Sequence, residues 1–521
     1  MKAEVTKCGR FIQITKATDQ EFKQMQYSFK RRTSNWKWHP LVKKGVWDGY
    51  IKFMDKFNRI PIGLWGKLNS ITEKHNIKLD FTGIDKIINQ EFSADEFEDW
   101  VWDFYRDTIY GKGGEKELRP YQIKSCIDTI KYFKSRSELA TSAGKTIIMF
   151  TIFAYLFEMG YAKKHLIIVP NTSLIIQTYE GFLEYAEGTR LENVKIQMIG
   201  GGRSKEKKDV DIVIGTYQTL KNLNKEFYDD ITCVAVDECH HTTAKSIKEI
   251  ITKSYDSKYR YGLSGTLKDD DSAESFTLDA YLGPIVNKVT SKFLIDNNYA
   301  TKIKVKSIIL DYMPEDSRKK LMDLRKKKGK NDNLDGTQLL DLEKKLVIEN
   351  DVRFRYIADM IGKTTKNSLV LFLDIKHGYG KKYYHYLREH SDKTIFYVDG
   401  DTKTEVREEY KRAMETGDNK ILVASFGTFA QGISINNLHH IFFVESYKSD
   451  RLIRQSLGRG MRLLEGKKVV YIWDFVDDFR VKDLRNAFTW IKNNYLYRHG
   501  QERIKTYKEQ GFPYKKYKVK L

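Results

Sequence analysis

Short runs of apolar residues recur along this chain, and polar or turn-forming residues bound each of them. Between Leu118 and about residue 300 there are four such runs, HLIIVP (165–170), VDIVIGT (210–216), ITCVAVDE (231–238) and YRYGLSGT (259–266). The segments between them carry helical patterns. Continuous apolar strands that alternate with helices are typical of a parallel sheet covered on both faces. The pattern therefore predicts an α/β domain.

The same rhythm returns in the second half of the chain. Its runs are SLVLFLDI (368–375), TIFYVDG (394–400), KILVAS (420–425), HIFFVES (440–446) and KVVYIWDF (468–475). A second α/β domain is therefore expected. The intervening segment 317–338 is highly charged and has no strand pattern, which indicates a linker or a solvated helical insertion.

The first hundred residues lack this rhythm and predict a small α+β accessory domain. The segment RRTSNWKWHPLVKKGVWDGYIKF (31–53) alternates basic with aromatic residues, and we expect most of these aromatics to form a core. Ser93 and Glu96 have the spacing of a capping box ahead of a helix. The basic tail PYKKYKVKL is expected to be solvated or loosely docked.

These patterns divide the chain into five expected segments. They are the accessory domain (1–110), the first α/β domain (111–300), a charged linker or insertion (301–345), the second α/β domain (346–490) and a basic tail (491–521). The length of 521 residues suits about three domains of ordinary size.

Composition favours a polyanionic partner, because 91 Lys and Arg against 70 Asp and Glu give a formal charge of +21. A basic soluble protein without such a partner is the alternative. The cysteines have no CxxC spacing, so we expect them reduced and intracellular. A zinc site from Cys233, Cys239 and His240 is a further alternative. The apolar run TIIMFTIFAYLF (146–157) is too short to span a bilayer and predicts a buried helix.

That run follows the stretch ELATSAGKT (138–146), which ends as a phosphate-binding loop does. Backbone N–H groups at the start of the helix would face an anion. Lys145 would reach the β- and γ-phosphates of a nucleotide, and the Thr146 hydroxyl would bind Mg²⁺. The strict spacing G-x-x-x-x-G-K-[ST] requires Gly where Leu139 stands. A chance match therefore stays open on this motif alone.

The run CVAVDECHH supplies two carboxylates at the end of a predicted strand. A carboxylate beside a phosphate loop can hold Mg²⁺, and the next acid can polarise a water for in-line attack. We predict the metal role for Asp237 and the base role for Glu238. An ordinary strand that ends in exposed acids is the alternative.

The sequence Asp237-Glu238-Cys239-His240 resembles motif II of the DExH branch of superfamily-two helicases. LRPYQ (118–122) resembles the family's adenine clamp, which implies that Arg119 and Gln122 contact ATP. The family usually has Ala or Gly at the place of Leu139 and Gly at that of Ser142, so the loop departs from the pattern twice.

Further family signatures occur in the expected order. IVPNTSLIIQ (168–177) and IGTYQTL (214–220) resemble motifs that grip the nucleic-acid backbone, which implies that Thr172, Thr216 and Gln218 bind nucleic acid. Ser264-Gly265-Thr266 resembles motif III. The resemblance implies that Ser264 and Thr266 couple hydrolysis to strand movement.

The second α/β domain carries two more signatures. RQSLGRGMR (454–462) resembles motif VI, which implies that Arg459 and Arg462 stabilise charge on the γ-phosphate. ILVASFGTFAQGISINNLHHI (421–441) resembles motif V, which implies that Ser425 and Thr428 contact nucleic-acid phosphate.

The resemblance implies two tandem RecA-like domains that bind ATP and Mg²⁺ in a cleft between them. The residues expected to bind ATP are Arg119, Gln122, Thr141, Ser142, Ala143, Gly144, Lys145, Thr146, Gly432 and Gln455. The metal ligands would be Thr146 and Asp237.

The accessory segment, together with IPIGLWGKL (60–68), resembles the N-terminal domain of phage recombination helicases. This implies an ATP-dependent DNA helicase that remodels branched DNA: branch migration, fork reversal, and unwinding of D-loops and R-loops. Its partners would be branched DNA, single strands and RNA in R-loops, in the cytoplasm of an infected bacterium, with no membrane. Candidate DNA contacts are Trp36, Lys37, Trp38, Lys43 and Lys44.

Two other functions stay open at this point. An RNA helicase or a double-strand translocase would share the motifs and the charge. A non-catalytic annealing protein with a decayed ATPase is an alternative of another class, although the complete set of motif residues argues against it.

Overall fold

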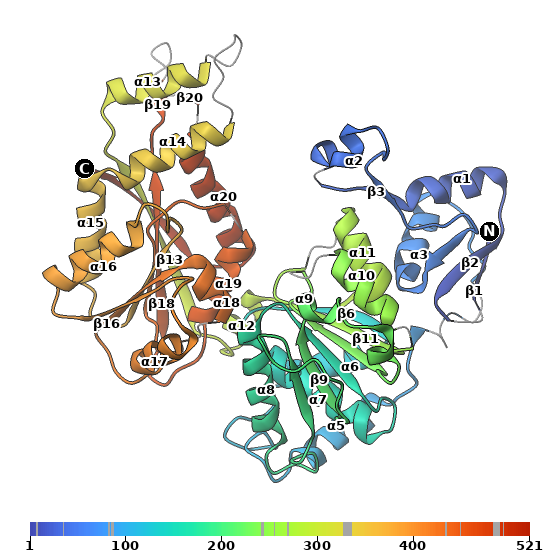
Figure 1. Ribbon diagram of the computed structural model, residues 1–521. Coiled ribbons are helices and arrows are strands. Elements are labelled where there is room, and N and C mark those ends of the chain that lie inside the picture. The colour runs from blue at the N-terminus through green and yellow to red at the C-terminus, as the bar shows by residue number, and fades with distance from the viewer. Residues whose placement is uncertain are drawn as a thin grey trace. The chain divides into compact units, whose positions relative to one another are not determined.

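The computed structural model of the protein describes residues 1–521 except 7–8, 35, 82–83, 85–87, 241–243, 255, 268–269, 327–335, 433–434, 449, 483–489 and 493. The chain divides into two compact units, Met1–Val289 and Thr290–Leu521, and each is described by itself (Figure 1). Among the described helices, none has the length and apolarity that crossing a bilayer requires.

A seven-stranded parallel sheet forms the centre of the first unit. In order across the sheet its strands are β12 (Ile285–Val289), β6 (Lys134–Leu139), β11 (Tyr259–Ser264), β10 (Cys233–Asp237), β7 (His165–Val169), β9 (Ile212–Thr216) and β8 (Ile196–Ile199). The four apolar runs of this region form β7, β9, β10 and β11, so the predicted parallel α/β domain is confirmed.

Strand β6 has no apolar run, yet it lies inside the sheet between β11 and β12. Its side chains Ser135, Arg136 and Ser137 are fully buried. Arg136 forms a buried ion pair with Asp279 and donates to the Gly283 carbonyl oxygen at 2.8 Å. Because the partners of Arg136 are distant in the chain, no local pattern marks the strand.

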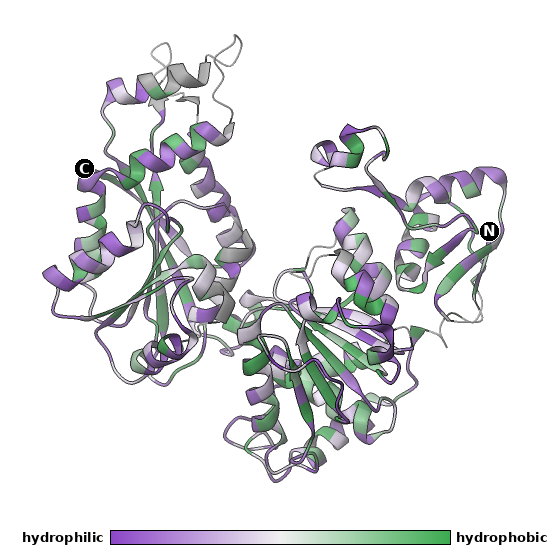
Figure 2. Cartoon of the chain, viewed as in Figure 1, coloured by the Kyte–Doolittle hydropathy of each residue, from purple (hydrophilic) through white to green (hydrophobic). Residues whose placement is uncertain are grey.

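Helices cover both faces of this sheet. Helices α6 (Pro120–Ile130), α7 (Lys145–Glu158) and α8 (Thr172–Ala186) pack together on one face, and α7 is the predicted buried helix. The other face carries α9 (Tyr217–Leu220), α10 (Ala244–Lys253) and α11 (Ala273–Leu282). In Figure 2 the strands of the sheet carry much of the green that marks hydrophobic residues. A short 3₁₀ helix, η3 (Lys225–Tyr228), precedes β10.

Helix α5 (Ala94–Phe104) begins after Ser93, whose side chain accepts from Glu96 N at 3.2 Å, as the capping spacing predicts. Phe97 packs edge-on against Tyr155 of α7, and Trp100 donates to Glu158 at 3.0 Å. The helix therefore packs on the first α/β domain, although residues 1–110 were expected to form the accessory domain.

The accessory domain is a small α+β fold, as predicted. An antiparallel sheet of β1 (Lys2–Val5), β2 (Phe11–Lys16) and β5 (Arg59–Pro61) packs with α1 (Asp19–Ser28), η2 (Ile62–Leu64) and α3 (Trp65–Lys74). Its core also contains Phe276 and Ala280 of α11. A two-stranded ribbon of β3 (Lys30–Arg32) and β4 (Tyr50–Lys52) carries η1 (Trp36–Trp38) and α2 (Pro40–Lys43). We name residues 30–52 the basic arm.

The second unit also contains a seven-stranded parallel sheet. In order its strands are β15 (Thr394–Val398), β16 (Lys420–Ser425), β14 (Ser368–Phe372), β17 (His440–Phe443), β18 (Val469–Asp477), β13 (Lys302–Asp311) and β21 (Tyr514–Lys520). The five apolar runs of this region form β14 to β18, which confirms the second α/β domain.

The helices of this unit are α12 (Ser291–Asp296), α13 (Glu315–Lys326), α14 (Gly336–Ile348), α15 (Asp351–Gly362), α16 (Tyr379–His390), α17 (Thr404–Glu415), α18 (Phe426–Gly432), α19 (Asp450–Gly460) and α20 (Tyr495–Glu509). The charged segment 317–338 was expected to be a linker or a helical insertion, and its described residues belong to helices α13 and α14. These helices pack on a small core that includes Leu321, Val347 and Leu496. The short strands β19 (Val481–Lys482) and β20 (Trp490–Lys492) pair antiparallel.

Two expectations about this unit are wrong. Residues 301–345 do not begin as a linker, because β13 lies between β18 and β21 in the sheet. The tail 491–521 is not separate from the second α/β domain, because it forms α20 and the edge strand β21. PYKKYKVKL is therefore docked through β21, whose side chains are largely exposed. Strands β13 and β21 both contain several lysines among their apolar residues. Neither strand therefore has the continuous apolar run from which the other strands were predicted. Arg503 of α20 pairs with the buried Asp474 at 2.8 Å and fastens the helix to β18.

Candidate functional site

The loop between β6 and α7 has two residues in the left-handed region of backbone space. Gly144 has φ 84° and ψ 40°, and Ser142 has φ 72°. Helix α7 begins at once at Lys145, so its first N–H groups lack helical partners and can bind an anion. Leu139 is the last residue of β6 and is fully buried. Leu139, which departs from the phosphate-loop pattern, is thus part of the strand. Ser142, the second departure, adopts a backbone conformation that glycine usually adopts.

Helix α6 supports this loop. The Tyr121 hydroxyl and Gln122 Nε2 both donate to the Ala143 carbonyl oxygen, at 2.9 and 3.2 Å. Gln122 Oε1 accepts from Arg119 N at 2.9 Å. A Cβ added at Gly144 would collide with the Gln122 amide. Both ends of the Gln122 amide therefore bind protein atoms here, and its contact with adenine stays a prediction, as does that of Arg119.

Lys145 and Glu238 form an ion pair of 2.9 Å, and each side chain is 14% exposed. Asp237 ends β10, and its Oδ1 accepts from Glu238 N at 2.9 Å. Burial raises the pKa of Asp237 to about 7, the charge of Glu238 adds to the rise, and the charge of Lys145 opposes it. Two adjacent carboxylates at this depth favour a bound cation, and oxygen donors are the ligands that Mg²⁺ prefers.

Glu238 connects the end of β10 to the end of the neighbouring strand β11. Its Oε2 accepts from Ser264 Oγ at 3.4 Å and from Gly265 N at 3.5 Å. His240 Nδ1 contacts the Ser264 hydroxyl, and His240 Nε2 lies 3.3 Å from Thr266 Oγ1. The predicted coupling residues therefore touch the predicted base, directly or through His240. Glu238 itself has φ 46°, an unusual value for a residue other than glycine.

The zinc alternative does not suit this geometry. Cys233 starts β10 and Cys239 follows its end, so at least roughly 13 Å of extended chain separates them. One zinc ion holds its ligands at about 2.0–2.3 Å. Both thiols are buried and unpaired, as is that of Cys126.

The predicted nucleic-acid threonines of the first unit lie at the carboxyl edge of the sheet. Thr172 begins α8 after β7, and Thr216 ends β9. Gln218 Nε2 donates to the Pro170 carbonyl oxygen at 3.2 Å, so it joins these two loops.

The glycines 200–202 after β8 lie at the same edge, and sequence reasoning did not assign them a site. All three have positive φ. A Cβ at Gly200 would lie 3.2 Å from Thr216 Oγ1, and one at Gly201 would collide with the Thr172 methyl group. Arg203 follows and donates to the Gly200 carbonyl oxygen at 3.2 Å. The run of three glycines in the sequence was the signal that the backbone approaches Thr172 and Thr216 closely here.

The motif residues of the second unit also lie beyond strand ends. Ser425 ends β16, and its hydroxyl lies 2.8 Å from that of Thr428. Arg459 is in the last turn of α19 with its guanidinium 5.7 Å from the Phe429 ring, and Arg462 follows the helix. Gly432 ends α18 and Gln455 is on α19. The Gln455 side chain is outside the described part of the structure, as is His241.

The basic arm does not bury its tryptophans, so the expectation of a core is wrong. Trp38 is 74% exposed, with the Lys43 ammonium 5.2 Å from its ring. Trp36 is half-buried under the Arg32 guanidinium at 3.8 Å. Trp47 is half-buried and donates to the Tyr50 carbonyl oxygen at 2.9 Å. The segment is too small to enclose three indoles. Lys37, Lys43 and Lys44 are exposed.

Two family models and several known proteins are similar to this chain. The family model "Type III restriction enzyme, res subunit" matches residues 115–269, and "Helicase conserved C-terminal domain" matches residues 352–463. The ATP-dependent DNA helicase uvsW of Enterobacteria phage T4 is 31% identical over 506 residues, which are 95% of this chain and 94% of that protein.

One more distant relative and one solved structure match parts of the chain. The putative ATP-dependent helicase IRC3 of Saccharomyces cerevisiae is 24% identical over 372 residues, 69% of this chain and 51% of that protein. The DNA-bound restriction-modification enzyme LlaBIII has the same fold, with a TM-score of 0.55 and 16% identity over 78% of this chain and 31% of that one.

Proposed function

The chain belongs to the superfamily-two helicases and is an ATP-dependent helicase; from that premise we propose that it is a DNA motor that remodels branched DNA. Its reactions would be branch migration of Holliday junctions, fork reversal, and unwinding of D-loops and R-loops, with strand annealing as a further activity. The similarity to phage T4 uvsW carries this proposal, because it extends over 95% of the chain and so includes the accessory domain. The setting would be the cytoplasm of an infected bacterium.

The proposed chemistry follows from the ion pair between Lys145 and Glu238. ATP phosphates at the start of α7 would attract the Lys145 ammonium and weaken this ion pair. The Glu238 carboxylate would then accept a hydrogen bond from the attacking water, while Ser264 and Gly265 N keep its other oxygen in place. Nucleotide binding would thus free the Glu238 carboxylate from Lys145, so that it can act as the base beside the γ-phosphate.

Further residues would complete this site. Thr146 and Asp237 would hold Mg²⁺, which neutralises charge on the β- and γ-phosphates when bound. Arg459 and Arg462 would stabilise charge that develops on the γ-phosphate. Thr141, Ser142, Ala143 and Gly144 would present backbone N–H groups to the phosphates.

Two sets of residues would bind DNA. Hydroxyl and amide groups at strand ends would hold the phosphate backbone, namely Thr172, Thr216, Gln218, Ser425 and Thr428. The basic arm would contact exposed bases and phosphates at a branch, because its exposed indole and lysines combine stacking with charge.

Strand-separation assays with ATP on a Holliday junction, a fork, an R-loop and a blunt duplex test this function. We expect faster reaction on the branched substrates than on the blunt duplex. An RNA helicase would prefer a forked RNA to the same fork in DNA, and a double-strand translocase would hydrolyse ATP equally well on blunt duplex.

The variants Lys145→Ala and Glu238→Gln serve as controls in the same assays. Each should lower ATP hydrolysis and unwinding by about a thousandfold or more, because each removes a group that acts on the reacting phosphate. If either variant separated a fork as fast as the parent, the proposed ATP site would be wrong.

A further inference from the structure

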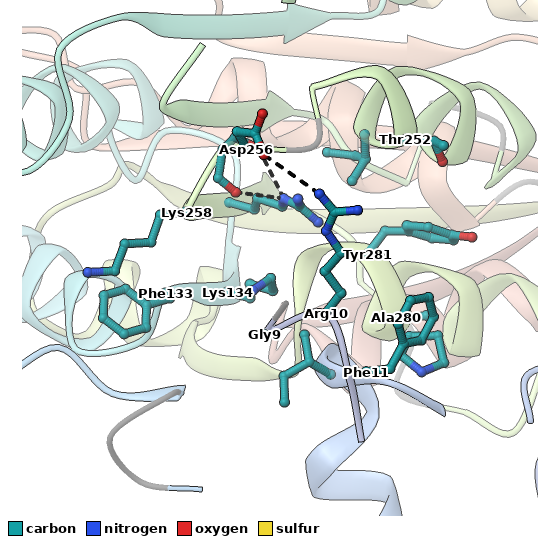
Figure 3. A pocket seen from close by; sticks show the side chains of 15 residues that line it. Gly9, Arg10, Phe11, Phe133, Lys134, Thr252, Asp256, Lys258, Ala280 and Tyr281 are labelled. Atoms are coloured by element: carbon teal, nitrogen blue, oxygen red, sulfur yellow. Dashed lines mark hydrogen bonds and ion pairs between the residues drawn. The ribbon is translucent and has the colours of Figure 1, made fainter. Parts of the chain in front are cut away.

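A cavity of about 540 Å³ lies where the accessory domain meets the first parallel sheet (Figure 3). Gly9 to Phe11, Pro61 and Ile62 line it from the accessory domain. The sheet side supplies the first residues of β6 and β11, the end of α10, and Ala280 and Tyr281 of α11. This is the size of many small-molecule sites.

The cavity lies at the edge of the sheet opposite the phosphate loop. Lys134 is the first residue of β6, and Leu139, its last residue, leads into the loop. The strand therefore separates the two places by roughly 17 Å. A ligand in this cavity would be distinct from the ATP bound at Lys145.

The cavity gathers four cationic side chains. Lys134 and Arg260 are in-register neighbours on β6 and β11, so they extend from the same face of the sheet. Arg10 reaches in from the accessory domain, and Lys258 lies at the rim with its ammonium 4.2 Å from the Phe133 ring. These positive charges converge from two parts of the fold.

Among the described lining residues, Asp256 is the one carboxylate, and it is 81% exposed. It faces Arg10 at 3.6 Å, as Figure 3 shows. Arg260 Nε donates to the Ser257 carbonyl and hydroxyl oxygens, both at 3.1 Å. Neither interaction gives the Lys134 ammonium a carboxylate partner.

Among the described lining residues, four cations share the cavity with one carboxylate, so the charge of the cavity favours a further anion. Burial and, to a smaller extent, the charge of Arg260 together lower the pKa of Lys134 to about 7. Burial also lowers the pKa of Arg260 to about 10, with a contribution from Arg10. Both Lys134 and Arg260 are half-buried, and cations that are withdrawn from water in proteins are normally paired. An anion between these groups would relieve the repulsion.

We propose that this cavity binds a phosphate monoester, with the phosphate between Lys134, Arg260 and Arg10 and the organic group against Phe133 and Tyr281. A phosphate offers several acceptor oxygens to the converging donors, and the Arg fork suits it. The aromatic rings provide a surface for a base or sugar. The ligand is either a free mononucleotide or the 5′-terminal phosphate of a DNA strand.

Such a ligand would connect the accessory domain to the sheet. Arg10 belongs to one and Arg260 to the other, and both would donate to the same phosphate. The accessory domain would therefore be held more firmly on the sheet when the cavity is occupied.

Calorimetric titration of the full-length protein tests the proposal. The ATP site is first saturated with a non-hydrolysable ATP analogue and Mg²⁺, and inorganic phosphate or thymidine 5′-monophosphate is then added. We expect saturable binding at one site, tighter for the nucleotide than for phosphate. Lys134→Gln and Arg260→Gln should each weaken binding by about tenfold or more, because each removes a charged hydrogen bond.

Two further sets of variants keep the outcome unambiguous. Lys163→Gln replaces an exposed lysine just before β7, at the same edge of the sheet, and should leave binding unchanged. Arg10→Gln and Lys258→Gln alter exposed side chains at the rim and should weaken binding several-fold even if the Lys134 and Arg260 variants fold poorly. Absence of saturable binding at millimolar ligand, or equal binding by parent and all four cavity variants, overturns the proposal.

Competition distinguishes the two sources of phosphate. A 5′-phosphorylated oligonucleotide that displaces thymidine monophosphate, while its 5′-hydroxyl counterpart does not, identifies a strand end as the ligand. Failure of both oligonucleotides to compete identifies a free nucleotide.

Discussion

Ser142 occupies a backbone conformation that glycine adopts without strain. A left-handed φ costs a residue with a Cβ about 1–2 kcal/mol, and glycine avoids this strain. Glycine also makes the unfolded chain more flexible, which lowers stability by roughly 0.5–1 kcal/mol. We therefore expect Ser142→Gly to leave ATP hydrolysis intact and to raise the free energy of unfolding by about 0–1 kcal/mol. ATPase rates and thermal melting check this.

Ser142→Val is the matched control at that position. A β-branched side chain at φ 72° is a severe outlier, so this variant should melt earlier and bind ATP more weakly. If Ser142→Gly were inactive, the serine hydroxyl would have a specific role that its backbone does not explain.

At the proposed ATP site, the sequence motifs predicted which residues lie close together. Lys145, Asp237 and Glu238 belong to short motifs whose spacing local chain geometry sets, and the structure places Lys145 within 2.9 Å of Glu238. Their catalytic roles stay predictions. The use of Gln122 to hold the Ala143 carbonyl oxygen was not predictable, because it depends on how α6 packs beside the loop.

At the scale of elements, we expect the basic arm to contribute to DNA affinity. Trp38→Ala should weaken binding to a fork by about 5- to 150-fold, because base stacking on an aromatic ring contributes roughly 1–3 kcal/mol. ATP hydrolysis without DNA should not change. Fluorescence anisotropy with a labelled fork, with and without ATP analogue, measures the affinity.

Phe57→Ala is the control for this variant. Phe57 is 56% exposed and carries the Lys56 ammonium 5.0 Å from its ring, so it matches the chemistry of Trp38 outside the arm. Equal loss of affinity in both variants, or no loss in Trp38→Ala, would remove the arm from the DNA-binding surface.

Elements differed in how well sequence predicted them. Strands with continuous apolar runs were found, because a fully buried strand in a parallel sheet needs apolar side chains on both faces. Strands β6, β8, β12, β13 and β21 were not predicted. β6 is polar because the distant Asp279 pairs with Arg136 and the nearby Thr129 contacts Ser135 and Ser137. β21 is a largely exposed edge strand.

At the scale of the whole molecule, Phe276 joins two parts of the first unit. This α11 residue is fully buried in the accessory core, in ring contact with Phe29 and Phe53, and the Arg31 guanidinium lies 3.8 Å from its ring. Phe276→Ala should destabilise the accessory domain by about 3–5 kcal/mol.

Limited proteolysis and thermal melting check this expectation. Cleavage should become faster within residues 1–90, while the sheet keeps its protection. Leu278→Ala, in the sheet core on the same helix, should instead lower the stability of the sheet. A Phe276→Ala protein with unchanged proteolysis would show that the accessory domain is stable without α11.

The sequence by itself determined the two parallel sheets and the motif residues at their strand ends, because apolar runs and glycine-rich turns are properties of short segments. Only the tertiary structure decided where the charged strands β6, β13 and β21 lie, which tryptophans stay exposed, and how Arg10 meets Lys134 and Arg260. Each of these depends on partners far away in the chain. A charge can occupy a sheet or a cavity only where such a partner or a ligand compensates it.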